Sequence, residues 1–489
     1  MQKNFILDTD SYKICHWKMA EEFTETVYSY CEARKGSEYK NVTFFGLQYI
    51  LKEQLCGEVV TQGMLIEARE IINPHLGSEE FLYLEMWQVI IDEFNGHLPI
   101  EIKAVAEGSQ VPEDCALFTI TNTDSRFGCL TNFIETPLMR SWYPITVASR
   151  SRAIVENITG YMEITSDNKP LSKFMLHDFG SRGATCREAA CIGGAAHLLN
   201  SYGTDTVSAI KFHKDYYGAD VNNVGFSVPA TEHSIACSFG PDEGEFKYVR
   251  TQMERFPTGI VSLVSDTYHA ERFVTHVIAG LKDEILTRHY TNTGDLPNKI
   301  VIRPDSPRYK GDTPEQQVLW IVKELDKIFG HSINSKGFRV LHPAVGVIYG
   351  DSLSENQITD IYEYLQLSGW SAESTVVGQG GGLMQKLNRD TCRFAIKASR
   401  VKVAGVWKNI QKTPLDKSKS SKTGKQKLVL MTDDNGVMGY KTINETHPLF
   451  HDLKDEMQVV FRNGALLVDH TLEEVRNNTG LWNTEEKLK

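Results

Sequence analysis

The sequence has no apolar run long enough to cross a membrane, and its cysteines show no paired spacing. A bilayer crossing needs about 20 consecutive apolar residues, so we expect no membrane-spanning segment. The nine cysteines include no C-x-x-C pair, which indicates reduced thiols and argues against structural zinc. Asp8 and Asp10 interrupt the N-terminus too early for the core of a signal peptide. These absences predict a cytoplasmic protein.

Three common catalytic motifs are also missing: G-x-S-x-G, H-E-x-x-H and G-x-x-x-x-G-K-[ST]. Their absence removes the support for a serine hydrolase or a zinc protease and weakens a nucleotide triphosphatase. The net charge of −11 argues against a general binder of nucleic acid or anionic membranes. We therefore expect no nucleic-acid and no membrane partner.

What is present is the composition of an ordinary globular protein, with 41% hydrophobic and 24% charged residues over 489 positions. This length predicts two or three domains. A polar turn at 165–170 marks a domain boundary, and apolar runs at 428–431 and 457–461 resemble strands that return to the first domain. We predict a sheet-rich α+β domain from 1–168 and 398–489, and an α/β domain at 169–397. Residues 5–7 are predicted as a short strand.

The middle of the chain repeats one pattern, a short apolar run, a polar or glycine residue, and then a helical pattern. The apolar runs lie at 174–176, 225–229, 260–264, 299–302, 345–349 and 376–377. Repeated strand–helix units predict a parallel sheet, either a barrel or an open doubly wound sheet. Six or seven such units favour the barrel, and in both folds the strand ends gather on one face.

The segment Val376–Asp390 contains Val-Val-Gly-Gln-Gly-Gly-Gly before a helical pattern. A strand, a glycine turn and a helix start direct free N–H groups at one spot, where the helix dipole favours an anion. Glycines let a bulky anion approach the main chain. A phosphate site is one interpretation, and an ordinary strand–helix turn is the other.

Polar and aromatic residues follow the predicted strands. They are Asp178, Phe179, Arg182, Asp205, His233, Asp266, Arg303, Asp305, Asp351 and the glycines of the loop. A single carboxylate at such a place is more often a helix cap, but seven loops that converge on one face indicate a site. Arginine suits phosphate, aspartate suits sugar hydroxyls, and a phenylalanine offers a stacking surface or belongs to the core. The set suggests a phosphorylated sugar and a flat aromatic partner.

Two further features stay open on the residues alone. His233 follows Glu232, so a carboxylate could orient or charge the imidazole, but a buried structural histidine is equally consistent. Lys408–Lys427 carries seven lysines without an apolar period. This stretch is either a solvated loop or a basic loop near a phosphate site.

The chain resembles the type II phosphoribosyltransferases, and among them the nicotinamide phosphoribosyltransferases. The resemblance rests on an ordered series of matches over almost the whole length: Asp10-Ser11-Tyr12-Lys13, Tyr28-Ser29-Tyr30, Gly96-His97-Leu98-Pro99-Ile100, Ser141-Trp142-Tyr143-Pro144, His177-Asp178-Phe179-Gly180, Gly203-Thr204-Asp205, Ser227-Val228-Pro229, Glu232-His233-Ser234, Arg303-Pro304-Asp305-Ser306 and Gly380-Gly381-Gly382. It implies an irregular α/β barrel with a sheet-rich domain from both chain ends. It also implies transfer of the phosphoribosyl group of phosphoribosyl pyrophosphate to nicotinamide, a step of NAD salvage.

The resemblance implies a role for individual residues. Phe179 would stack on the pyridine ring, facing Tyr12 of the other subunit of a homodimer, and Asp205 would accept from the carboxamide. Catalytic roles would fall on His233, Asp305, Arg303, Asp266 and Glu232. Substrate contacts would come from Asp10, Tyr12, Phe179, Arg182, Asp205, Ser262, Gly350, Asp351, Gly381, Gly382, Arg34, Arg389, Lys397 and Lys419.

The implied co-reactants are Mg²⁺, held mainly by pyrophosphate and water, and ATP, which would transiently phosphorylate His233. Gly346 stands where the family leads us to expect an arginine, and Ala395 where it leads us to expect a serine. Lys419 is placed only approximately, because the basic loop differs in length. The alternatives are a nicotinate-preferring transferase, against which Asp205 argues, and a non-catalytic binding protein on the same fold.

Overall fold

The computed structural model describes residues 4–291, 296–305, 311–350, 352–415, 420–432 and 436–482. Its contacts divide the chain into two units. The first contains residues up to 149, residues 213–219 and the chain from 387 onward, and the second contains 150–212 and 220–386. Both chain ends therefore contribute to one unit, and the middle of the chain forms the other.

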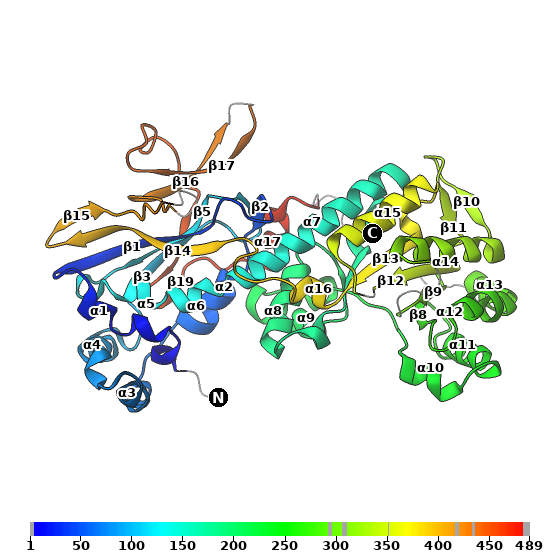
Figure 1. The fold of residues 1–489 in the computed structure, drawn as a ribbon, viewed down its shortest axis with the longest axis horizontal. Coiled ribbons are helices and arrows are strands. Elements are labelled where there is room, and N and C mark those ends of the chain that lie inside the picture. Colours follow the sequence, from blue (N-terminus) through cyan, green and yellow to red (C-terminus); the bar gives the residue numbers. More distant parts are fainter. Residues whose placement is uncertain are drawn as a thin grey trace. The chain divides into compact units, whose positions relative to one another are not determined.

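The first unit is built on a seven-stranded sheet with the order β15-β14-β1-β5-β3-β18-β19. Its strands are β1 (Thr24–Ala33), β3 (Ile100–Ala104), β5 (Ala116–Asn122), β14 (Phe394–Val403), β15 (Val406–Asn409), β18 (Gln458–Arg462) and β19 (Ala465–Leu466). All neighbouring strands are antiparallel, and Figure 1 shows β1 and β14 side by side along their length. In β3 every second side chain is buried, as expected for a sheet with one covered face.

Shorter elements complete the first unit. Its helices are α1 (His16–Met19), α2 (Leu47–Ile50), α3 (Gln62–Leu76), α4 (Leu84–Phe94), α5 (Leu130–Phe133), α6 (Glu135–Met139) and α17 (Leu472–Thr479). Two separate antiparallel pairs are β2 (Asn41–Thr43) with β4 (Gln110–Pro112), and β16 (Gln426–Thr432) with β17 (Met438–Asn444). Strand β16 begins at Gln426, within the last residues of the basic stretch 408–427.

The second unit contains a six-stranded parallel sheet with the order β7-β6-β13-β12-β9-β8. Its strands are β6 (Leu176–Asp178), β7 (Gly203–Thr204), β8 (Ile260–Val264), β9 (Lys299–Arg303), β12 (Val345–Tyr349) and β13 (Thr375–Gln379). Valine and isoleucine dominate these runs, as is usual for parallel strands that are covered on both faces. The pair β10 (His331–Ile333) and β11 (Arg339–Leu341) is antiparallel and separate.

An irregular segment links the two edge strands of this sheet. Phe226 forms an isolated parallel bridge with Gly203 of β7, and Ala230 forms another with Ser262 of β8. The backbone N–H of Thr231 donates to the Ser262 carbonyl at 3.0 Å. Because one segment touches both edges, the strands form an irregular barrel, closed without a seventh regular strand.

Helix α7 precedes the first strand of the parallel sheet, and the other helices of this part of the chain come after its strands. These helices are α7 (Trp142–Thr165), α8 (Arg187–His197), α9 (Val207–Tyr217), α10 (His233–Phe239), α11 (Glu243–Arg255), α12 (Ala270–Arg272), α13 (Lys282–Tyr290), α14 (Pro314–Phe329), α15 (Glu355–Leu367) and α16 (Gly381–Met384). Figure 1 shows α14 beside the parallel strands, where its apolar stripe, including Val318 and Val322, is buried. Helices α7 and α9 each belong partly to the first unit.

The predicted fold class, an irregular α/β barrel with a sheet-rich domain built from both chain ends, is confirmed. The strand prediction at residues 5–7 is wrong, because this segment is a 3₁₀ helix whose first turn is capped by the Asn4 side chain, which accepts from Ile6 N at 3.1 Å. The predicted domain limits at 168 and 397 lie further along the chain than the unit limits at 149 and 386.

Candidate active site

The ends of the parallel strands bring the predicted residues to one edge of the second unit. Parallel strands that run side by side present their carboxyl ends on the same face, which is where α/β folds build their sites. The residues concerned are Phe179 after β6, Asp205 after β7, Asp266 after β8, Arg303 and Asp305 at β9, Gly350 after β12, and Gly381 and Gly382 after β13. Asp351 lies outside the described residues.

Asp205 is held by two side chains, one from strand β6 and one from the irregular segment between the edge strands. His177 Nε2 lies 3.0 Å from Asp205 Oδ1, and Ser227 Oγ donates to the same oxygen at 2.5 Å. Burial would raise the pKa of Asp205, but the contacts with His177 and Ser227, together with the charge of Arg303, hold it below its usual value. The side chain therefore presents a carboxylate, about two-fifths exposed, at neutral pH.

The Phe179 ring packs against two glycines, Gly350 and Gly378. A Cβ built on Gly350 would be 2.6 Å from Phe179 Cε2, and one built on Gly378 would be 2.0 Å from the same atom. The His177 ring lies beside Phe179 with a centroid distance of 5.0 Å and an interplanar angle of 48°. Gly350 and Gly378 carry no side chain, so one edge of the phenyl ring can pack against their backbone.

His233 begins helix α10 and faces two carboxylates. Its Nδ1 lies 3.0 Å from Thr267 Oγ1, while Nε2 lies 3.8 Å from Asp266 Oδ1 and 3.7 Å from Asp305 Oδ2. Asp266 is almost fully buried and its Oδ2 accepts from Asp305 N at 2.8 Å. The imidazole is thus oriented by Thr267 and remains accessible between two acidic groups.

Glu232 is directed elsewhere. It precedes α10, and its carboxylate accepts a short hydrogen bond from the Ser234 hydroxyl. The described contacts of the neighbouring His233 imidazole are with Thr267, Asp266 and Asp305.

The buried polar atoms near the strand ends that have no hydrogen-bond partner within the described ranges include Arg303 Nε and Ser262 Oγ. Arg303 Nη2 donates to the Thr231 carbonyl, which fixes the guanidinium against the closing segment of the barrel. Buried polar groups usually find a partner, so unpaired donors in such a place are available to a ligand.

The glycine loop after β13 has open space at its centre. A Cβ on Gly381 would meet no atom within 4 Å, whereas one on Gly382 would lie 2.9 Å from Gln379 Nε2. Arg150 Nη1 donates to the Gly382 carbonyl at 2.8 Å and to the Lys386 carbonyl at 2.9 Å, and this holds α16 from its far end. Arg182 is exposed on the 3₁₀ turn Ser181–Gly183, whose Gly183 packs beside Gly381.

The remaining predicted residues belong to the first unit. Asp10 accepts from Thr136 Oγ1 at 2.7 Å, and the Tyr12 side chain is 59% exposed. The exposed Arg389 pairs with Asp390 at 3.2 Å, and burial lowers the pKa of Lys397. Lys419 lies outside the described residues.

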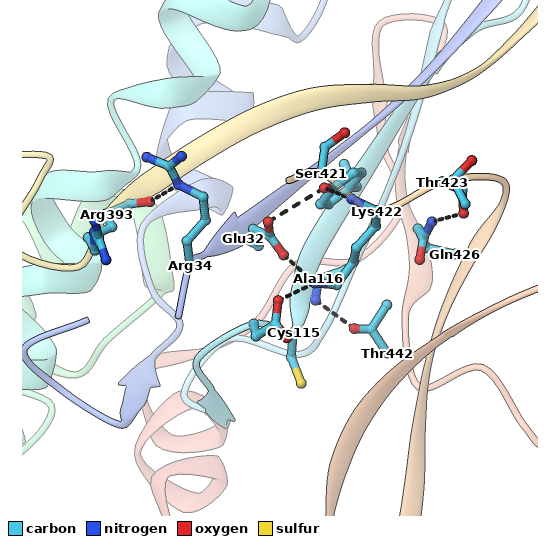
Figure 2. Close-up of polar contacts among 12 residues, drawn as sticks. Glu32, Arg34, Cys115, Ala116, Arg393, Ser421, Lys422, Thr423, Gln426 and Thr442 are labelled. Carbon is cyan, nitrogen blue, oxygen red and sulfur yellow. Dashed lines mark hydrogen bonds and ion pairs between the residues drawn. The ribbon is translucent and has the colours of Figure 1, made fainter. Parts of the chain in front are cut away.

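A polar cavity of about 390 Å³ lies beside Arg34 in the same unit. Figure 2 shows its main contact, in which Lys422 Nζ lies 2.6 Å from Glu32 Oε2; Lys422 also lies 2.5 Å from Asp114 Oδ1. The Lys422 backbone N–H donates to Tyr30 Oη at 2.7 Å. The figure also shows Arg34, whose Nε donates to the Arg393 carbonyl at 3.0 Å. These contacts attach the end of the basic stretch to strand β1.

Two family models match the chain. The nicotinate phosphoribosyltransferase (NAPRTase) family matches residues 174–465, and the nicotinamide phosphoribosyltransferase N-terminal domain matches residues 4–102. The chain therefore belongs to the nicotinate phosphoribosyltransferase family. The resemblance read from the strand-end motifs is confirmed.

Relatives agree over nearly the full length. The chain is 38% identical over 479 residues to a nicotinamide phosphoribosyltransferase of Xanthomonas campestris, which covers 97% of both chains. It is 32% identical to one of Acinetobacter baylyi, over 96% of this chain and 95% of the relative. Among solved structures, human nicotinic acid phosphoribosyltransferase is 14% identical with a TM-score of 0.56, over 97% of this chain and 93% of that chain. A nicotinate-nucleotide pyrophosphorylase of Pyrococcus furiosus gives a TM-score of 0.57, also at 14% identity, over 98% of this chain and 95% of that chain. The two structures support the fold.

For several residues at the strand ends, no role could be predicted from the sequence. His177 and Ser227 contact Asp205, Thr267 contacts His233, and Gly378 lies under Phe179. His177 and Ser227 stand within motifs that carry the resemblance, but their partner is distant in the chain, so only the fold reveals the contact.

The described residues show neither a metal-binding cluster nor a membrane-spanning helix. Over the described ranges, no cluster of three or more histidine, cysteine, aspartate or glutamate side chains has the arrangement of a metal site. No described helix has both the length and the apolar character needed to cross a bilayer.

Proposed function

We propose that this protein transfers the phosphoribosyl group of phosphoribosyl pyrophosphate to nicotinamide, giving nicotinamide mononucleotide and pyrophosphate. The family and the names of the two bacterial relatives support this reaction. The observation that carries the choice of base is the Asp205 carboxylate next to Phe179, at the ends of adjacent strands.

The pyridine ring would stack on Phe179, whose ring packs against the backbone of Gly350 and Gly378. Asp205 would accept a hydrogen bond from the carboxamide NH₂. A carboxylate in this place attracts an amide donor and repels the carboxylate of nicotinate, which brings a like charge and no donor. A nicotinate-preferring enzyme is the outcome that this geometry disfavours.

The phosphoribosyl group would lie against the remaining strand ends. Asp305 would accept from ribose hydroxyls, and Arg303 would contact phosphate through its unpaired Nε. The open backbone of the glycine loop would receive the 5′-phosphate. Further phosphate contacts would come from Arg182, Ser262, Gly350, Asp351, Gly381 and Gly382.

The reaction would break the bond between the anomeric carbon and pyrophosphate while the ring nitrogen attacks from the opposite face. Cationic side chains stabilise the departing charge where it develops. Mg²⁺ would be held mainly by the pyrophosphate and water, where it neutralises the same charge. Asp305, beside His233, lies where it can stabilise the positive charge on the ribose.

ATP would act as a co-substrate at His233. The imidazole Nε2 faces Asp266 and Asp305, while Thr267 holds Nδ1, so Nε2 is the nitrogen free to attack the γ-phosphorus as ADP leaves. Transient phosphorylation of His233 would place negative charge beside Asp305. It would also drive the phosphoribosyl transfer toward product.

The active form would be a homodimer. Tyr12 is a large aromatic side chain with 59% exposure, which suits a ring that caps a pyridine in the partner subunit. Arg34, Arg389, Lys397 and Lys419 would reach the pyrophosphate and ATP. A molar mass from light scattering equal to one chain would contradict this part of the proposal. A cytoplasmic location stays a prediction.

The test is an incubation of the purified protein with phosphoribosyl pyrophosphate, Mg²⁺ and nicotinamide, with and without ATP, followed by chromatography for the mononucleotide. We expect product, and more of it with ATP. Asp305→Ala should lose at least about a hundredfold in turnover, since it removes a group that contacts the transition state. A protein that binds nicotinamide but forms no product with any pyridine base would be a non-catalytic member of the fold.

A further inference from the structure

The Asp205 side chain receives both of its described hydrogen bonds on one carboxylate oxygen. His177 Nε2 and Ser227 Oγ both reach Oδ1, at 3.0 Å and 2.5 Å. Within the described part of the chain, no side chain or backbone group donates to Oδ2. One oxygen is therefore engaged by the protein, and the other is free to meet a ligand.

Three separate segments make this arrangement. His177 lies in β6 and pairs in parallel register with Gly203 of β7, two residues before Asp205, while Ser227 comes from the segment that closes the barrel. Gly203 has to lack a side chain, because a Cβ there would be 2.8 Å from His177 Nδ1 and 3.1 Å from the Leu176 carbonyl. Any substituent at 203 would displace the imidazole from Asp205.

We propose that His177 and Ser227 are positioning residues that set the preference for an uncharged pyridine amide over a pyridine carboxylate. This inference rests on the proposed transfer to nicotinamide. With Oδ1 saturated by two donors, the carboxylate cannot rotate without losing both, and Oδ2 remains a directed acceptor. The amide NH₂ can donate to it, whereas a ligand carboxylate offers only acceptors.

The preference for nicotinamide over nicotinate would thus depend on Asp205, His177 and Ser227 together and not on Asp205 alone. When the donors on Oδ1 are removed, the carboxylate gains rotational freedom and takes up a proton more readily. Either change weakens the acceptor that the amide needs and lowers the repulsion that excludes nicotinate. The phosphoribosyl contacts come from other strand ends and should not change.

The test compares His177→Leu, His177→Gln and Ser227→Ala with the unaltered protein. His331→Leu is the matched control. His331 is also paired with an aspartate, Asp326, at 2.6 Å, but it lies in β10, outside the six-stranded parallel sheet. We would measure kcat and KM for nicotinamide, nicotinate and phosphoribosyl pyrophosphate. A lost hydrogen bond to a charged group corresponds to roughly a tenfold to hundredfold change.

We expect His177→Leu to raise the nicotinamide KM by about that factor and to lower the ratio of nicotinamide to nicotinate kcat/KM. The KM for phosphoribosyl pyrophosphate should stay within about twofold, because the hydrogen bond from His177 to Asp205 does not contribute to the binding of this substrate. His177→Gln should recover much of the loss, because its amide nitrogen can donate to Oδ1. Ser227→Ala should give a smaller effect in the same direction, and His331→Leu none.

The proposal is overturned if His177→Leu keeps the original nicotinamide KM, if all three substrates are affected equally, or if His177→Gln is no better than leucine. Should His177→Leu fail to fold, Ser227→Ala decides, because Ser227 is exposed and its substitution leaves the core intact. Failure of the proposed function shows separately, as no product from the unaltered protein. Calorimetry with nicotinamide then tests the positioning: weaker binding by the variants supports it, and equal binding overturns it.

Discussion

Adding one methyl group at Gly378 should displace the ring on which the pyridine stacks. Gly378 lies in β13 beneath Phe179, and a Cβ there would be 2.0 Å from Cε2 and 2.5 Å from Cδ2 of the phenyl ring. Ordinary contact begins at 3.4 Å, so the ring edge has to retreat by about 1.4 Å. Gly378→Ala therefore moves the stacking surface without changing any predicted polar contact.

The size of the effect follows from two estimates. An extra methyl in a packed site costs about 1–3 kcal/mol, and a misplacement of about 1 Å near the reacting groups can cost a hundredfold in rate. We expect the kcat/KM for nicotinamide to fall by roughly tenfold to a hundredfold. The KM for phosphoribosyl pyrophosphate should change little.

The assay is steady-state kinetics with each substrate varied, together with thermal unfolding. Gly160→Ala is the matched control: it adds the same methyl in helix α7, where a Cβ meets nothing within 4 Å, and should leave the kinetics unchanged. In Phe179→Leu the clash is relieved, so adding Gly378→Ala to it should cost much less than in the original chain. A Gly378→Ala protein with unaltered nicotinamide kinetics would refute the placement of Phe179.

Further predictions concern the charged groups. Asp205→Asn should reduce the nicotinamide to nicotinate preference by roughly tenfold to a hundredfold in a competition assay, and an unchanged ratio would remove Asp205 from the pocket. Because its contacts hold the pKa of Asp205 below its usual value, Asp205 stabilises the fold above about pH 4 and loses this contribution as the pH falls further. The difference in urea midpoint between the original chain and Asp205→Asn should therefore shrink as the pH falls below about 4, and a difference that grows in this range would contradict this. Lys422→Met should lower the free energy of unfolding by about 3 kcal/mol, because buried Glu32 loses its cation, and adding Glu32→Gln should restore most of it. Burial already raises the pKa of Glu32, so the stability of Lys422→Met should fall further as the pH rises; a pH-independent loss would point to packing instead.

Four strands of the barrel, β8, β9, β12 and β13, were predictable because each contains a short apolar run bounded by polar residues or glycine, whereas the two-residue strand β7 (Gly203–Thr204) has no apolar run and was not predicted. The runs at 260–264 and 345–349 coincide with β8 and β12, and the residues that follow them stand at the strand ends, as expected for parallel strands. The segment 225–229 follows the same pattern but forms only isolated bridges. Pro229 has no N–H for a ladder, which explains the break.

Contacts between distant segments could not be predicted in the same way. The hydrogen bonds from His177 and Ser227 to Asp205 depend on the register of three segments, which no local pattern specifies. In the sequence, Gly378 is only one of several glycines in a glycine-rich segment. Its contact with Phe179 depends on the position of that ring, which follows another strand. At 428–431 the strand was predicted, but it belongs to the separate hairpin β16–β17.

The most direct test of the central claim is a crystal structure of the protein with nicotinamide mononucleotide. We expect the pyridine ring to stack on Phe179, the amide nitrogen to lie about 3 Å from Asp205 Oδ2, and the phosphate to lie on the glycine loop at Gly381. A mononucleotide bound away from these strand ends, or an amide turned away from Asp205, would contradict it.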